Sequence, residues 1–305
     1  MGKYKYPIII DTDIGDDIDD TWALSFIIAS SYFDIRLIMV SNYDTNYKAR
    51  LVAKLLQTYN KTDIPIGITL KTKCPDNYRF GQGKWLKDFK LEDYKGMVYK
   101  ENVYKIAAEM TKKEKIAFFS LGTSKTFEVL LDNYPFVKDN SFIIAMLGSI
   151  NKGYEGKLEQ CVEYNVGTNI NSTKKVLESN WEYVMLPLDV CSTLKLKGKN
   201  YERLIKSDSI YAKTLVENYK CWLVDSIFPN DNVFEKGSSI LFDIIVPWYA
   251  MFNDKFIIKK DCLYVDDKGF IKKGKDHQIT YAIDLKDVEE LYTKTIDILT
   301  KWKEK

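Results

Sequence analysis

Short apolar runs alternate with longer amphipathic stretches along the first two thirds of the chain. Runs at 7–11 (PIIID), 35–41 (IRLIMVS) and 115–121 (KIAFFSL) are apolar at successive positions, and helical patterns follow at 46–59 and 124–134. Strands that are apolar on both faces are typical of a parallel sheet with helices on each side. The pattern predicts an α/β fold with a mainly parallel, Rossmann-like central sheet flanked by helices.

The last third of the chain carries a different pattern. Residues 201–237 are helical and rich in aromatic side chains, and 238–252 (SSILFDIIVPWYAMF) predict an apolar helix. Residues 256–284 alternate and turn like a β-hairpin before a last amphipathic helix. Since no repeat, low-complexity run or linker interrupts the chain, we expect a single domain over 1–305.

Composition narrows the class of protein. The net charge is +2 and only four basic residues are Arg, which disfavours a nucleic-acid partner. Five widely spaced cysteines without a C-x-x-C pair are typical of reduced thiols in a cytosol. No signal segment and no apolar run of membrane-spanning length is present, so we expect a cytoplasmic protein without a membrane partner.

Six carboxylates lie within ten positions at the end of the first predicted strand, in DTDIGDDIDD at 11–20. Ligands of parallel α/β sheets collect at the carboxyl ends of strands. A hard divalent cation would offset this much like charge, whereas the alternative is that Asp16, Asp17 and Asp19 only cap the next helix. Asp243, inside an apolar run, also needs a cation nearby, either the same metal ion or a lysine.

Several segments, in order along nearly the whole chain, resemble the nucleoside hydrolase family, the inosine-uridine preferring nucleoside N-ribohydrolases. DTDIGDDIDD is similar to a longer form of the family's Asp-Thr-Asp signature, and VEYNV to its Glu-aromatic-Asn motif. The other matching segments are MVSNYDTNYKARLVAKLL with DIPIGI, GQGKWLKDFKLEDYKG, LGTSKTFEVLLDNYP and AMLGS.

The resemblance implies Ca²⁺ at the bottom of a pocket and a water on it that attacks C1′ of a ribonucleoside, releasing ribose and free base. It implies that Asp13 is both general base and metal ligand. The other implied metal ligands are Asp20, Asp243 and the backbone carbonyl of Lys125. The implied substrate-binding residues are Asp19, Asn42, Met146, Glu163 and Asn165. An extended EYN segment would point Glu163 and Asn165 to one side. Relatives form homodimers or homotetramers, so we expect self-association.

The chain departs from the family pattern at three places. Phe242 occupies the position of a family His that protonates the leaving base, and the single histidine, His277, lies in a polar segment near the hairpin. Lys157 replaces an Asn that contacts the ribose 5′ hydroxyl, which leaves open whether the substrate carries a 5′-phosphate. The signature is two residues longer than its short form, so Asp17 competes with Asp19 for the ribose.

Purine-preferring relatives stack the base between aromatic rings, and the sequence leaves purine or pyrimidine preference open. The candidate rings are Trp222, Phe228, Trp248 and Tyr249. Two other functions compete with nucleoside hydrolysis. One is a haloacid-dehalogenase-like phosphatase with Asp11 as nucleophile and Asp13 as acid, for which Asp266 and Asp267 would complete a Mg²⁺ site. The other is a ribose- or nucleoside-binding protein without turnover.

Overall fold

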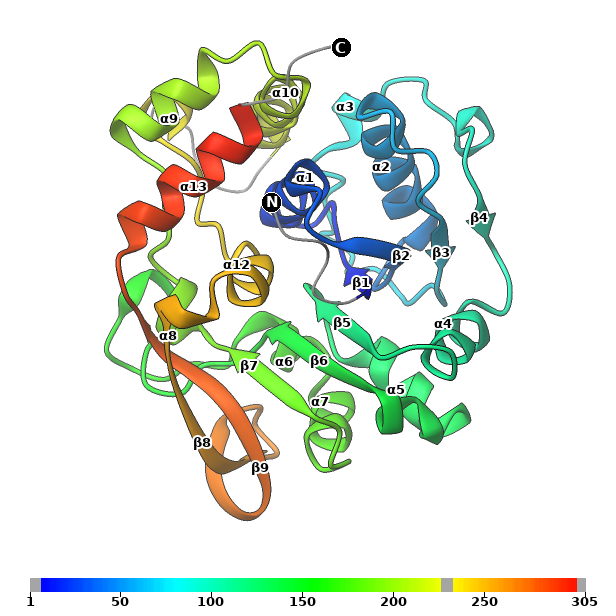
Figure 1. The fold of residues 1–305 in the computed structure, drawn as a ribbon, viewed down its shortest axis with the longest axis vertical. Helices are drawn as coiled ribbons and strands as arrows, with labels where there is room; N and C mark the ends of the chain where they lie inside the picture. Colours follow the sequence, from blue (N-terminus) through cyan, green and yellow to red (C-terminus); the bar gives the residue numbers. More distant parts are fainter. Residues whose placement is uncertain (1–6, 226–232, 301–305) are drawn as a thin grey trace.

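The computed structural model describes residues 7–225 and 233–300, which build one nine-stranded sheet (Figure 1). The strand order is β4-β3-β2-β1-β5-β6-β7-β9-β8; all neighbours are parallel except β8, which is antiparallel to β9. The strands are β1 Pro7–Thr12, β2 Asp34–Val40, β3 Ile66–Ile68, β4 Val98–Tyr99, β5 Ile116–Ser120, β6 Ser141–Met146, β7 Tyr183–Leu186, β8 Phe256–Val265 and β9 Ile271–Leu285. The predicted α/β class with a mainly parallel sheet and a carboxyl-terminal hairpin is confirmed.

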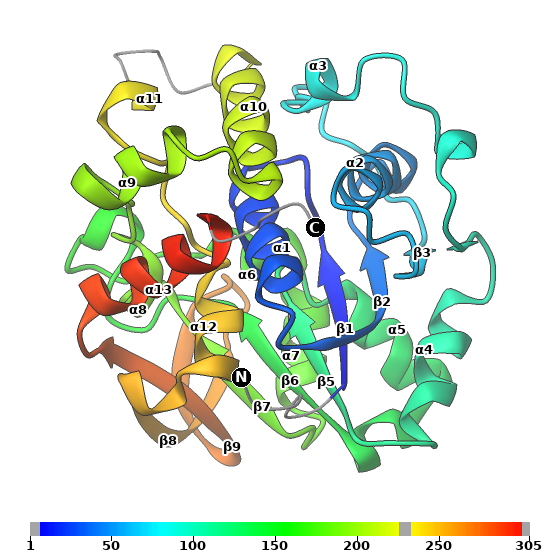
Figure 2. The ribbon, with the colours of Figure 1, turned by 45° about the horizontal axis from the view of Figure 1, so that its top comes forward.

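Helices cover both faces of the sheet (Figure 2). In β1, Ile8 and Ile10 belong to one apolar cluster and Ile9 to the other, so alternate side chains enter opposite layers. The first layer contains α1, α2, α10, α12 and α13, and the second α4, α5 and α7. The helices are α1 Asp19–Ser30, α2 Thr45–Thr58, α3 Gly83–Leu86, α4 Val103–Thr111, α5 Lys125–Asn133, α6 Tyr164–Thr168, α7 Ile170–Leu177, α8 Leu188–Cys191, α9 Gly198–Ile205, α10 Ile210–Asp225, α11 Val233–Lys236, α12 Ile245–Met251 and α13 Val288–Thr300.

The carboxyl ends of the central strands are tied together. The Ser41 amide, just after β2, donates to the Thr12 carbonyl at 3.0 Å, and the Leu121 amide, just after β5, donates to the Asp11 carbonyl at 2.9 Å. These bonds bring the three loops after β1, β2 and β5 to one edge of the sheet. In the described part of the chain no helix is long and apolar enough to cross a bilayer.

The predicted helix over 238–252 is wrong in its first half, because α12 begins only at Ile245. The Ser238 amide donates to the Leu196 carbonyl at 3.0 Å, and the Leu241 amide to the Leu194 carbonyl at 2.8 Å. These long-range bonds replace helical ones and hold the segment extended. Asp243 therefore lies in the turn before α12, where its buried side chain faces the amino-terminal end of α1.

Candidate active site

Asp13 occupies the loop between β1 and α1 and meets residues from the two neighbouring strand ends. The Asn42 side-chain Nδ2 donates to Asp13 Oδ2 at 3.3 Å. On the other side is Gly122, where an added Cβ would lie 3.0 Å from the Asp13 carboxyl carbon. Glycine at this position therefore leaves the space that the Asp13 carboxylate occupies.

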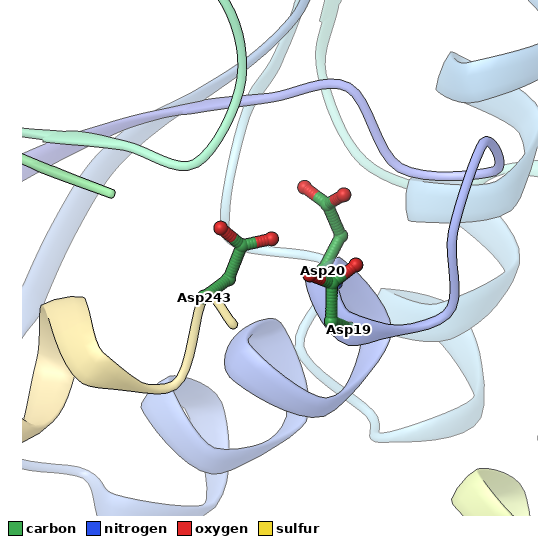
Figure 3. Close-up of side chains that lie close together, drawn as sticks. All are labelled: Asp19, Asp20 and Asp243. Atoms are coloured by element: carbon green, nitrogen blue, oxygen red, sulfur yellow. The ribbon is translucent and has the colours of Figure 1, made fainter. Parts of the chain in front are cut away.

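Three further carboxylates converge on the same edge. Oxygens of Asp19, Asp20 and Asp243 all lie within 4.8 Å of one another, and the three side chains are buried (Figure 3). Asp19 and Asp20 start α1, and Asp243 approaches them from the turn before α12. Asp20 accepts a hydrogen bond from the Thr12 hydroxyl. A signature from the amino terminus and an acid more than 200 residues later thus form one cluster, as the sequence predicts.

Burial and mutual repulsion shape the acidity of this cluster. Burial raises the pKa of Asp13, Asp19 and Asp243 well above the ordinary value, and the neighbouring carboxylates raise it further. Burial also raises the pKa of Asp20, to about 7, against the opposing effect of the Thr12 hydrogen bond. Ca²⁺ accepts irregular shells of carboxylate and carbonyl oxygens, so the donor set fits a hard divalent cation that would compensate this charge.

The trio of neighbouring carboxylates, Asp19, Asp20 and Asp243, differs from the ligand set that the family resemblance implies. It contains Asp19, for which the resemblance implies ribose binding, and it does not contain Asp13. Asp13 is nevertheless close, since its charge raises the pKa of Asp243. Lys125, the first residue of α5, follows β5 beside β1, and its Nζ pairs with Glu128 at 2.5 Å. Its backbone carbonyl as a ligand stays a prediction.

Glu163 and Asn165 lie at the carboxyl end of β6, and EYN forms the start of α6, so the condition of an extended segment is not met. Glu163 caps α6, accepting from the Asn165 amide at 2.7 Å, the Val166 amide at 3.2 Å and the Gly148 amide at 2.9 Å. Asn165 Nδ2 donates to the Met146 carbonyl at 3.2 Å. The cap of α6 joins Glu163, Asn165 and Met146 in one contact network.

The candidate base-stacking rings do not come together. Trp248 is fully buried and donates from Nε1 to Thr295 Oγ1 at 2.8 Å, which makes it a core residue. The Tyr249 ring packs 5.2 Å from Phe256, and its pKa is raised by burial and by Glu182, which precedes β7 and so lies at the opposite sheet edge. Both lie away from the carboxylates because α12 runs from the site into the core.

Trp222 is the described candidate ring that packs on the segment before α3. It lies on α10 and stacks on Tyr219, with ring centroids 6.0 Å apart. A Cβ on Gly81 would lie 2.9 Å from its Cδ1, so the indole packs on the segment before α3. Phe228 lies outside the described residues. Trp222 therefore remains the one candidate, among those described, beside this loop.

Asp11 is fully buried, and its side chain hydrogen-bonds to residues that follow the two neighbouring strands. Its two carboxylate oxygens accept from the Ser41 hydroxyl at 3.0 Å and the Thr126 hydroxyl at 2.6 Å. Asp266 accepts from the Lys268 amide at 2.9 Å inside the β8–β9 turn. This arrangement argues against the phosphatase alternative, which requires an available Asp11 nucleophile.

Lys48 was missed by the sequence interpretation. It lies on α2, is fully buried, and donates from Nζ to Asp16 Oδ1 at 2.6 Å and to the Ile14 carbonyl at 3.2 Å. The available signal was its spacing, because Lys48 shares the apolar stripe of α2 with Val52 and Leu55. A lysine on a core-facing stripe indicates a buried anion.

A cavity of about 430 Å³ opens beside Asn42. It is lined by polar and small side chains from the β2–α2 loop, the segment after β3 and the end of α6: Asn42, Tyr43, Thr72, Lys73, Cys74, Pro75, Asp76, Thr168 and Asn169. Because Asn42 also contacts Asp13, the cavity adjoins the carboxylate site. Lys157 is exposed in its loop.

The metal-free protein should lose stability as the pH rises. Burial raises the pKa of Asp11 and Asp20 to about 7 and of Asp17 to about 6. Between about pH 4 and about pH 7 the folded state therefore binds more protons than the unfolded chain. The resulting stabilisation is complete below about pH 4 and disappears as the pH rises to about 7. In excess chelator we expect the Tm to fall by about 5 °C or more between about pH 5 and about pH 8. Saturating Ca²⁺ should reduce this fall in Tm. A metal-free Tm that rises between about pH 5 and about pH 8 would contradict the raised pKa of these buried carboxyls.

Solved structures share this fold across nearly the whole chain. A plant nucleoside hydrolase superposes with a TM-score of 0.82 at 15% identity, covering 97% of this chain and 99% of its own. The purine-preferring ribonucleoside hydrolase of Gardnerella vaginalis gives 0.76 at 16% identity, with 96% and 98% covered. The inosine-uridine preferring nucleoside hydrolase of Bacillus anthracis gives 0.76 at 14% identity, with 97% and 99% covered.

Sequence comparison gives a family but no individual relative. No curated protein matches the chain in sequence. The family model described as inosine-uridine preferring nucleoside hydrolase matches residues 8–291, which span the acidic signature, the EYN motif and Asp243. The chain therefore belongs to the inosine-uridine preferring nucleoside hydrolase family, a family of N-glycosyl hydrolases.

Proposed function

We propose that this chain hydrolyses the N-glycosidic bond of a ribonucleoside to ribose and free base, with Ca²⁺ as cofactor and Asp13 as general base. The observation that carries the proposal is the convergence of buried carboxylates from β1, α1 and the turn before α12 in a chain of this family. Asp13, Asp20, Asp243 and the Lys125 carbonyl would hold the ion, and the carboxylate of Asp19 lies beside those of Asp20 and Asp243. Bound Ca²⁺ would offset the carboxylates and acidify a coordinated water.

The chain's own residues suit an oxocarbenium-like transition state. The Asn42 side-chain amide holds Asp13 through Oδ2, and burial raises the pKa of Asp13, which makes its carboxylate a stronger base toward water. The negative charge of Asp19 and Asp20 favours the positive charge that develops on the ribose. Glu163 and Asn165 are fixed by backbone groups, which suits a pair that orients the sugar.

Departure of the base cannot use imidazole at the family position. Phe242 stands there, and its ring meets the Tyr154 ring edge-on with centroids 5.8 Å apart. His277 is paired with Asn180, which precedes β7 at the opposite sheet edge. We propose that an aromatic contact assists the base instead, with Trp222 as the candidate ring.

Ribose release tests the function. We expect purified protein with Ca²⁺ to release ribose from at least one nucleoside of a purine and pyrimidine panel, and the panel should include 5′-nucleotides and p-nitrophenyl phosphate. Asp243→Ala should abolish release, whereas Asp276→Ala, an exposed acid on β9, should not. Nucleoside binding by calorimetry without ribose release would support a binding protein, and phosphate release lost in Asp11→Asn would support a phosphatase.

A further inference from the structure

Asp16 lies inside the acidic signature, and a buried lysine on α2 pairs with it. Lys48 Nζ donates to its Oδ1 at 2.6 Å, to the Ile14 carbonyl at 3.2 Å and to the Asp13 carbonyl. Since Lys48 is fully buried, these contacts satisfy its charge inside the protein. The pair fixes the backbone of the loop that carries Asp13.

Two tyrosines reach the same carboxylate from other segments. The Tyr78 hydroxyl, from the segment between β3 and α3, donates to Asp16 Oδ1. The Tyr164 hydroxyl, from α6, lies 3.5 Å from Asp16 Oδ2 and 3.4 Å from the Tyr43 hydroxyl. Tyr164 is the middle residue of EYN, so Asp16 joins the acidic loop, the segment after β3 and the motif that carries Glu163.

Aromatic rings extend this contact along the segment after β3. Tyr78 packs edge-on against Tyr43 and Phe80, with centroids 5.3 and 5.0 Å away, and Phe80 packs 4.9 Å from Tyr47. The segment is otherwise poorly buried, as Leu70 is 69% exposed and Phe80 48% exposed. Hydrogen bonds tie its two ends, from the Tyr43 backbone amide to the Thr72 hydroxyl at 2.8 Å and from the Gln82 backbone amide to the Tyr47 hydroxyl at 3.0 Å, and the Tyr78 contacts support the stretch between them.

The cavity beside Asn42 is lined by these same segments, through Tyr43, residues 72–76 and residues 168–169. We propose that Asp16, fixed by Lys48, is a positioning residue that closes the substrate entrance by holding the Tyr78 and Tyr164 hydroxyls. The role in substrate entry rests on the proposed function. Asp16 does not touch the reacting atoms; it sets the fraction of molecules in which the entrance segments are closed, and the apparent affinity scales with that fraction.

Single hydroxyl deletions test the proposal without removing a buried charge. We expect Tyr78→Phe to raise KM about 10-fold and to change kcat by less than about 2-fold, because a bond to a charged group is lost. Tyr164→Phe should raise KM less, in keeping with its longer contact. Asp16→Asn should raise KM at least as much as Tyr78→Phe, and adding Tyr78→Phe to it should cause little further change.

Hydrogen exchange gives a readout that does not depend on catalysis. Exchange across residues 69–82 should quicken about 10-fold in Tyr78→Phe and Asp16→Asn. The matched control, Tyr264→Phe on β8, should leave both KM and this exchange unchanged. Unaltered KM and exchange in Tyr78→Phe and Asp16→Asn would overturn the proposal. If the wild-type protein hydrolyses no nucleoside, the proposed function fails, and exchange alone then decides whether Asp16 holds the segment.

Discussion

Asp13→Asn should lower kcat for nucleoside hydrolysis by about 10³-fold, because the general base and one predicted metal ligand are removed together. The substitution preserves the shape of the side chain and the space opposite Gly122. It also removes a buried charge that repels Asp20 and Asp16. In chelator at about pH 8 the variant should therefore unfold at a Tm equal to or above that of the wild type.

Single-turnover kinetics and thermal unfolding on the same samples check this expectation. Loss of kcat together with unchanged or raised metal-free stability cannot result from misfolding. Asp276→Asn provides a control for one lost negative charge at an exposed position on β9, and both its kcat and Tm should match the wild type. Wild-type kcat in Asp13→Asn would refute the general-base assignment, whatever its Tm.

The parallel part of the sheet was predictable because its central strands are buried on both faces. Ile8, Ile9 and Ile10 are all fully buried, so β1 shows the unbroken apolar run that distinguishes a parallel strand. The location of the acidic cluster was predictable from the parallel sheet, since the carboxyl ends of neighbouring parallel strands lie at one edge of the sheet. Asp243 was predictable as a candidate member of the acidic cluster only because a charged side chain in an apolar run needs a cation nearby.

Local sequence misled where long-range bonds decide the backbone. Residues 238–241 continue the apolar run of α12, but the Ser238 and Leu241 amides donate to the Leu196 and Leu194 carbonyls. Propensity is a weak prior there, and these long-range hydrogen bonds outweigh it. The sequence left the conformation of EYN open, and the Glu163 carboxylate caps the turn that Tyr164 begins.

Which aromatic rings could stack on a base was the least predictable feature. An apolar helix such as α12 carries rings that face either a ligand or the core, and its composition is the same in both cases. The Trp248 indole is satisfied by Thr295 of α13, a partner 47 positions away. The Asp16 and Lys48 pair was hidden for a similar reason, since only the folded chain brings the loop after β1 onto α2.

Removal of divalent cations should abolish nucleoside hydrolysis, and Ca²⁺ should restore it. Burial raises the pKa of Asp19 and of Asp243, and the Asp20 carboxylate beside them raises both further, so a cation that binds this trio stabilises the folded state by mass action. Ca²⁺ should raise the Tm of the chelated protein by about 5 °C or more at saturation. Mg²⁺, which requires regular octahedral geometry, should restore less activity than Ca²⁺ at equal concentration.

Asp243→Asn separates the catalytic ion from a merely stabilising one. Asp243 is the one member of the trio that comes from outside the acidic signature, so its loss should leave α1 and Asp13 in place while weakening Ca²⁺ binding by at least about 10-fold. Calorimetric titration of Ca²⁺ should show that loss, and hydrolysis by the variant should require correspondingly more Ca²⁺. Full hydrolysis by the wild type in excess chelator would eliminate the cation from the reaction. Full hydrolysis by Asp243→Asn at the wild-type Ca²⁺ requirement would remove Asp243 from the ligand set. If the Asp243 carboxylate, within 4.8 Å of those of Asp19 and Asp20, does bind the ion, its loss must raise the Ca²⁺ concentration that hydrolysis requires.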